Sequence, residues 1–248
     1  AQELREMVAD AQRSGFPIAV HAVEREAVEA VTQVLQDAEE VAAASSSGRS
    51  KEKRESDQSA FSSAASRHRI EHCAECPPDL VAQVRRCGAM VVTQPGFVYW
   101  EGDRYLERVK PSLLPHLYPV GSLARAGVPL AFGSDAPVID PNPWPAIYGA
   151  VTRSTRRGAA LPPENCTEPG QGVMVEAALR MYTLGGALAE GSQARKGSIA
   201  PGKLADLVLV DSDPREVAPL MLKEIRAVLT IIGGQVVWDG GLLGRDAD

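Results

Sequence analysis

Apolar positions along the chain follow two different spacings. Short apolar runs, typical of buried strands, alternate with segments in which apolar residues recur every three or four positions, typical of amphipathic helices. The runs predict strands over residues 17–23, 68–72, 89–93 and 128–132. The helical spacing predicts helices over residues 4–11, 28–41, 77–86, 120–126, 144–152 and 174–184. Such alternation indicates α/β structure, with parallel strands and crossover helices.

The pattern changes after residue 196. Three further strands are expected over residues 204–210, 228–232 and 235–238, and Gly233-Gly234 is a typical hairpin turn between the last two. We therefore expect two domains, with βα units in residues 1–195 and a small β portion in residues 196–248.

Two segments interrupt the regular pattern. Residues 45–66 are rich in serine and charge and almost lack large apolar side chains, so we expect a mobile surface loop. A phosphorylated or partner-binding segment is the alternative. The stretch after residue 93, which carries Phe97, Tyr99, Trp100 and Tyr105, is expected to be a long irregular connection.

Composition excludes several classes of partner. The chain has 248 residues, of which 44% are hydrophobic, which is enough for a sizeable core. A net charge of -6 and a pI near 5.4 argue against nucleic acid and anionic membranes as partners. No apolar run approaches the ~18 residues of a membrane span.

The cysteines are too few for a disulfide framework in a chain of this length. Cys73 and Cys76 have the C-x-x-C spacing of a redox or zinc site, but the second pair of a zinc ribbon is missing. We expect free thiols and a cytoplasmic protein, although a chain that begins with Ala1 says nothing of targeting. A thiol redox protein is a weaker alternative.

Three of the predicted strands end on, or are followed by, a residue able to bind a divalent cation: His21, His72 and Asp135. Parallel βα units present their C-terminal strand ends on a common face. Two imidazoles and a carboxylate there suit Zn²⁺ or a similar ion, which would also compensate the charge of Asp135. Taken singly, each residue also fits an ordinary core, surface or turn position. His68, at the opposite end of its strand, and His116, in a loop, are left out.

Several segments together carry a family resemblance. They are AVHAVE (19–24), HRIEHC (68–73), TQPGF (93–97), LAFGSDAPV (130–138), GSIAPGKLADLVLVD (197–211) and TIIGGQVVWDG (230–240). They resemble amidohydrolase family 3, the group of the metal-dependent amidohydrolase superfamily that includes the N-substituted formamide deformylases. The resemblance covers nearly the whole chain except residues 45–66.

The resemblance implies the C-terminal part of a (β/α)₈ TIM barrel, flanked by a small β-sandwich built from both chain termini. His21, His72 and Asp135 would be metal ligands from strands 5, 6 and 8 of that barrel. Asp135 would also take a proton from the attacking water. The implied function is metal-dependent hydrolysis of a C–N bond in an amide or formamide-like small molecule, with zinc as the expected metal.

The sequence departs from the family pattern in its ligands. The family opens with an H-x-H pair on strand 1 and usually carries a lysine or other bridging group on strand 4, and neither is found here. We therefore expect a C-terminal half that needs an N-terminal half, or a homo-oligomer. The rival interpretation is a non-catalytic or degenerate subunit. The missing ligands favour it, whereas the retention of His21, His72 and Asp135 together argues against it.

Candidate substrate-binding residues follow the third and fourth strands. Gln94 and the aromatic residues Phe97, Tyr99 and Trp100 are expected to line an apolar pocket for an N-aryl or N-alkyl amide. Arg153 is expected to meet a polar group of the substrate. Ordinary packing of the aromatic side chains and a solvated arginine at a helix end are the alternatives.

Overall fold

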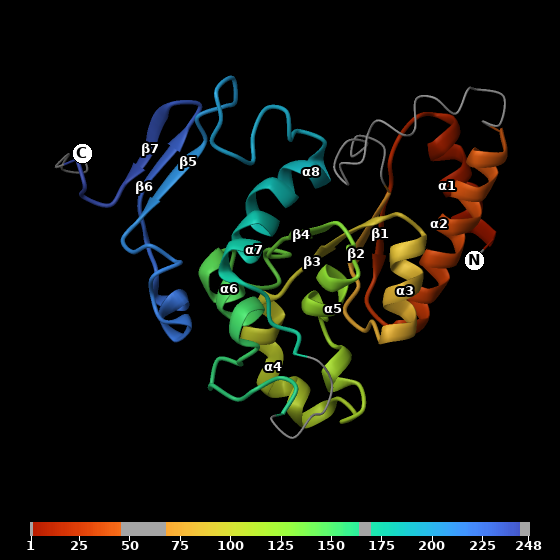
Figure 1. Ribbon diagram of the computed structural model, residues 1–248, viewed down its shortest axis with the longest axis horizontal. Helices are drawn as coiled ribbons and strands as arrows, with labels where there is room; N and C mark the ends of the chain where they lie inside the picture. The colour runs from red at the N-terminus through yellow and green to blue at the C-terminus, as the bar shows by residue number, and fades with distance from the viewer. Residues whose placement is uncertain (1, 46–67, 164–169, 244–248) are drawn as a thin grey trace. The chain divides into compact units, whose positions relative to one another are not determined.

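The computed structural model describes residues 2–45, 68–163 and 170–243 (Figure 1). The chain forms two compact units. The first comprises Ala1–Thr93, Val109–Ala131 and Thr167–Gln171, and the second comprises Gln94–Arg108, Phe132–Cys166 and Gly172–Asp248. The loop predicted over residues 45–66 lies, apart from its first residue, outside the described residues. The domain boundary expected at residue 195 stays a prediction.

A parallel sheet forms the centre of the first unit. Its strands are β1 (Ala19–Ala22), β2 (Arg69–His72), β3 (Met90–Thr93) and the first residues of β4 (Leu130–Phe132), in the order β1-β2-β3-β4. Ile70 lies opposite Val20 on one side and Val91 on the other, in parallel register. The predicted strands and their parallel pairing are confirmed. β4 begins later than expected, after Pro129, because proline has no N–H to donate to a ladder. β1 begins at Ala19, because Pro17 likewise lacks an N–H and the Ile18 N–H donates to His68 Nδ1 at 3.2 Å.

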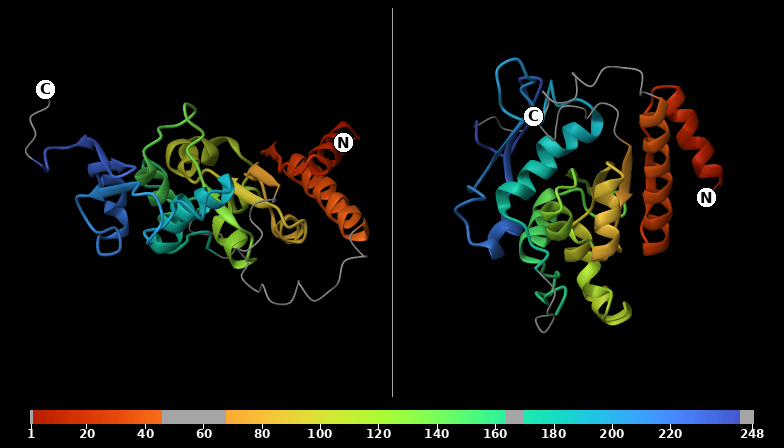
Figure 2. Two further views of the ribbon diagram at one scale, coloured as in Figure 1. Left: turned by 90° about the horizontal axis from the view of Figure 1, so that it is seen from above. Right: turned by 45° about the vertical axis from the view of Figure 1, so that its right-hand side comes forward.

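Helices cover this sheet. They are α1 (Gln2–Arg13), α2 (Arg25–Ser45), α3 (Pro78–Arg86), α5 (Val120–Arg125) and the short 3-10 helix η3 (Leu114–His116). α1 lies beside α2, which also packs on α3 (Figures 1 and 2). Val8, Val28 and Leu80 are buried between these elements. Burying one such side chain contributes about 1.5–3 kcal/mol, which is why the helical spacing predicted α1, α2, α3 and α5 correctly; η3 was not predicted.

The second unit contains the α-helices α4 (Gly96–Arg108), α6 (Pro143–Thr152), α7 (Val175–Arg180) and α8 (Gly186–Glu190). The π-helical turn η4 (Met181–Gly185) joins the last two, so the helix expected over residues 174–184 continues further. Asn142 caps α6 by accepting a hydrogen bond from the Trp144 N–H at 3.1 Å. None of the helices in the described residues is long and apolar enough to cross a membrane.

The prediction of an irregular connection after residue 93 was wrong, because α4 is a helix of 13 residues there. Its sequence begins with glycine, aromatic and β-branched residues, which have modest helix propensity. Phe97, Val98 and Gly102 are nevertheless buried on one side of the helix, and α4 packs on α6. Tertiary packing therefore outweighs local propensity.

Gly149 lies where α6 approaches the start of α4 closely. A Cβ there would lie 2.8 Å from the Pro95 carbonyl oxygen. We expect Gly149→Ala to lower the free energy of unfolding by about 1–3 kcal/mol, because backbone atoms must separate. Gly186→Ala is the matched control, since this helical glycine has nothing within 4 Å. Chemical denaturation should show the control unchanged or more stable, and equal effects of the two substitutions would contradict the prediction.

A three-stranded antiparallel sheet ends the second unit (Figure 1). It consists of β5 (Leu207–Val210), β6 (Ala227–Ile232) and β7 (Gln235–Asp239), and the 3-10 helix η5 (Pro219–Glu224) precedes β6. The predicted hairpin is confirmed, with Gly233 and Gly234 at φ of 58° and 84°. Two aspartates flank β5. Asp206 Oδ1 accepts the Gly233 N–H at 2.8 Å, and Asp211 Oδ1 accepts the Arg226 N–H at 3.1 Å.

Candidate metal centre

The first unit brings His21 and His72 together. His21 lies in β1 and His72 is the last residue of the neighbouring β2. Their ring centroids are 4.5 Å apart, with the ring planes at 74°. His72 is buried at 8% exposure, whereas His21 is open to solvent. The structure thus places two of the predicted ligands side by side, and imidazole nitrogens are donors that zinc commonly uses.

A left-handed turn is what allows this pairing. Ala22, not His21, lies opposite His72 in the β1–β2 register, so regular strands would point the two imidazoles to opposite faces. His72 and Cys73 instead have φ of 73° and 52°, a conformation that is uncommon for residues other than glycine. The chain therefore leaves the sheet geometry at His72, and its ring reaches that of His21.

Asp135, the third predicted ligand, belongs to the second unit. It follows β4 at a φ of 59° and is exposed. Within the described residues its carboxylate makes no hydrogen bond or ion pair, so water solvates its charge. Its membership of the ligand set stays a prediction. No group of three or more histidine, cysteine, aspartate or glutamate side chains in residues 2–45, 68–163 and 170–243 is arranged to hold a metal ion.

The predicted substrate-binding residues all lie in the second unit. Gln94 and Phe97 are buried, and the Tyr99 ring packs edge-on against Trp100 at 5.0 Å. Sequence reasoning missed three neighbours of this aromatic group: Tyr148 lies 5.6 Å from Tyr99, Arg156 stands 4.9 Å over Trp100, and Lys223 stands 5.1 Å over Tyr148. They come from separate parts of the sequence, which explains why no local pattern indicated them. The role in substrate binding stays a prediction.

Arg153 is not the solvated helix-end arginine that was the alternative expectation. It does end α6, at a φ of 57°, but it is buried, and burial lowers its pKa to about 10. Its Nε donates to the Leu161 carbonyl at 3.0 Å, and the Leu161 N–H donates back to the Arg153 carbonyl at 2.8 Å. The side chain thus holds the loop between these two residues, and its contact with substrate stays a prediction.

A sequence model of the amidohydrolase family matches residues 1–238. The chain belongs to the amidohydrolase family. It is 32% identical to the N-substituted formamide deformylase of Arthrobacter pascens over 174 residues, which make up 67% of this chain and 30% of that protein. The chain spans about a third of the length of the curated relatives that it matches.

Solved structures show the same fold. A metal-dependent hydrolase from Pyrococcus horikoshii superposes with a TM-score of 0.66 at 22% identity, over 88% of this chain and 38% of that one. An adenosine deaminase from Xanthomonas campestris, solved with bound zinc, has a TM-score of 0.57 at 20% identity, over 95% of this chain and 48% of that one. The expected α/β fold with a parallel sheet is confirmed.

In this amidohydrolase family member, His68 and three cysteines of the described residues take part in the packing and hydrogen bonding of the fold. His68 Nδ1 accepts the Ile18 N–H at 3.2 Å, in keeping with its exclusion from the ligands. Cys73, Cys76 and Cys87 are buried thiols. A hydrogen bond with Cys76, together with burial, raises the pKa of Cys73. A buried thiol of raised pKa is a poor nucleophile, which argues against the redox alternative.

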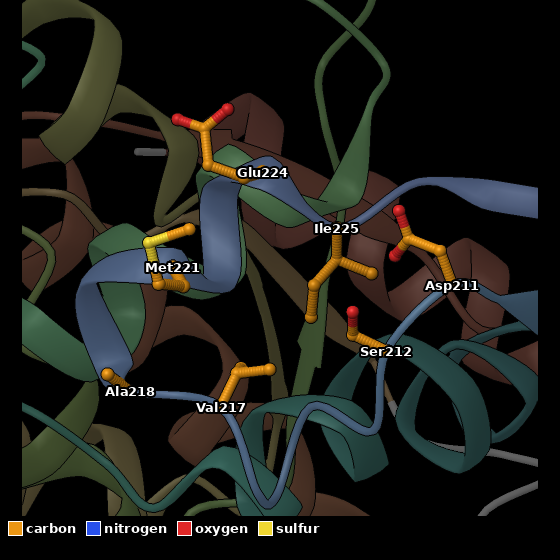
Figure 3. A pocket seen from close by; sticks show the side chains of 7 residues that line it. All are labelled: Asp211, Ser212, Val217, Ala218, Met221, Glu224 and Ile225. Atoms are coloured by element: carbon orange, nitrogen blue, oxygen red, sulfur yellow. The ribbon is translucent and has the colours of Figure 1, made fainter.

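The second unit of this family member also carries a surface pocket of about 360 Å³ (Figure 3). Its lining is Asp211, Ser212, Val217, Ala218, Met221, Glu224 and Ile225. None of these residues was a sequence candidate. The Asp211 carboxylate already accepts a backbone hydrogen bond from Arg226, so it contributes to the sheet as well as to the pocket.

Proposed function

We propose that the chain is the C-terminal, metal-binding part of a metal-dependent amidohydrolase that cleaves the C–N bond of a small amide or formamide-like molecule. The observation that carries the proposal is the pair of imidazoles, 4.5 Å apart at neighbouring strand ends, in a chain of this family. In fold terms, the βα units would complete a (β/α)₈ barrel and the C-terminal sheet would form part of a β-sandwich.

His21 and His72 would hold the cation through neutral imidazole nitrogens, together with Asp135. A divalent cation bound there, zinc in our proposal, would supply a Lewis acid that polarises the scissile carbonyl. The donor set fits zinc in chemistry, because imidazole and carboxylate are both common zinc ligands. The exposed edge of His21 leaves that ligand accessible from solvent.

Asp135 would act as the general base. Its carboxylate takes a proton from the attacking water and returns it to the leaving nitrogen, so that amide and water become a carboxylic acid and an amine. A solvated carboxylate without a protein partner in the described residues is available for this task. Gln94, Phe97, Tyr99 and Trp100 would hold the apolar substituent of the substrate, and Arg153 a polar group.

A second candidate is a non-catalytic or degenerate subunit that needs an N-terminal half. The observation in its favour is that the part of the chain described here holds no group of three donors arranged for a metal ion. In that case the histidine pair would be retained without turnover.

Metal content of the freshly purified chain, and hydrolysis by the complete protein in which the rest of the barrel accompanies this chain, test the proposal. We expect about one equivalent of zinc by elemental mass spectrometry and, from the complete protein, release of amine from N-substituted formamides or amides. A chelator should stop the reaction and added zinc should restore it. Bound zinc without hydrolysis would establish the second candidate, and absence of metal would overturn the ligand assignment.

A further inference from the structure

A lysine from η5 stands over two aromatic rings of the second unit. The Lys223 Nζ lies 5.1 Å from the centre of the Tyr148 ring and 6.0 Å from the centre of the Tyr99 ring. An ammonium group at such a distance is attracted by the negative charge on the face of a ring. Among the described residues this ammonium group has no hydrogen bond or ion pair, so its contacts there are with the two rings.

The backbone that carries Lys223 is fixed by other side chains. Leu222, which precedes the lysine, is 1% exposed, and Ile225, two residues after it, is 4% exposed. The whole of η5 packs on α6. Burial of two large apolar side chains outweighs a single partly solvated contact between a cation and a ring. The charge of Lys223 is therefore not needed to dock η5, and its effect falls on the rings.

The two tyrosines that Lys223 contacts differ in accessibility. Tyr148 is 2% exposed, whereas Tyr99 is half-buried and stands edge-on against it at 5.6 Å. Tyr99 also meets the half-buried Trp100 edge-on at 5.0 Å. Rotamers of side chains that reach solvent interconvert rapidly unless neighbours hold them. Because Lys223 contacts both tyrosine rings, it holds the accessible ring of Tyr99 against the fixed ring of Tyr148.

We propose that Lys223 is a positioning residue for substrate binding: its ammonium group fixes the Tyr99 ring in the orientation that meets the apolar substituent of the substrate. The inference rests on the proposed function, which assigns Tyr99 to that substituent. Lys223 does not touch the substrate in this role. The C-terminal part of the chain thus takes part in substrate selection through one charge.

NMR of the chain itself tests the position of the ring. Lys223→Met keeps the unbranched side chain and removes the charge, whereas Lys223→Arg keeps a cation over the rings. The cross-peak between the ring protons of Tyr99 and Trp100 should be strong in the wild type and in Lys223→Arg, and weak in Lys223→Met. Lys110→Met is the matched control, because Lys110 is exposed, and it should leave the cross-peak unchanged. An unchanged cross-peak in Lys223→Met would overturn the inference.

Kinetics of the complete protein with N-phenylformamide provide the second readout. In Lys223→Met, KM should rise about 3–10-fold while kcat stays unchanged, because a weaker hold on the substituent affects binding and not the reaction itself. Lys223→Arg should restore KM, and Lys110→Met should not alter it. A fall in kcat alone, or equal effects of the two methionine variants, would contradict the positioning role. If the wild-type complete protein hydrolyses neither formamides nor amides, the proposed function fails, and the cross-peak alone still decides the role of Lys223.

Discussion

Replacing Asp135 by asparagine should reduce the rate of amide hydrolysis by about 10²–10⁴-fold, because a general base contributes a factor of this size. The fold should survive. Asp135 is exposed, and within the described part of the chain its carboxylate makes no hydrogen bond that asparagine would lose. Asparagine also tolerates the left-handed conformation that Asp135 adopts at a φ of 59°. Turnover of the wild-type substrate and a thermal unfolding curve measure the two halves of the prediction.

Asp140→Asn is the control for this substitution. Asp140 is exposed in the same connection, and its Oδ1 accepts the Asn142 N–H at 2.8 Å. Activity should be retained, since the residue has no assigned part in the reaction. If an Asp135→Asn variant hydrolyses the substrate at the wild-type rate, Asp135 is not the general base.

Replacing His72 by alanine should abolish zinc binding at stoichiometric concentrations. Loss of a ligand must weaken the site more than loss of a group that merely orients one, so we expect more than about a 100-fold drop in affinity. His21→Ala should have the same effect, since the two rings are neighbours at 4.5 Å. Zinc content after dialysis against a weak chelator measures the loss.

His116→Gln controls for the loss of any histidine from the first unit. His116 lies in η3, and its backbone carbonyl rather than its ring carries the contact with Cys76. Zinc content should therefore be unchanged. If His72→Ala and the wild-type chain retain equal amounts of zinc, the histidine pair is not the metal site.

Most strands could be predicted because apolar runs and the glycine pair at Gly233 and Gly234 act locally. α4 could not, because its stability comes from burial of Phe97 and Val98 against α6, which begins only at Pro143. The burial of Arg153 was missed for a similar reason, since its partner Leu161 returns to it through a loop.

The candidate site was predictable in its members and not in its geometry. The positions of His21 and His72 at strand ends indicated that they are metal ligands. The regular alternation of side chains along a strand, however, would have pointed their rings to opposite faces of the sheet. A histidine followed by a cysteine does not by itself indicate a positive φ, so the left-handed conformation of His72 and Cys73 could not be predicted from the sequence. The sequence predicts free thiols at Cys73 and Cys76, with a redox or zinc site as the alternative, but it does not predict their burial, because packing depends on segments distant in the chain.

The two aspartates that flank β5 fix the position of the neighbouring strand β6. Asp206 holds one end of β6 through Gly233, and Asp211 holds the other end through Arg226. A strand slip of one residue reverses which side chains face each side of a sheet. With a carboxylate at each end, a slip of the whole of β6 would break both hydrogen bonds, whereas the irregularity of the ladder between Leu209 and Val210 leaves both intact. The two aspartates of the motif ADLVLVD therefore determine where the neighbouring strand begins and ends.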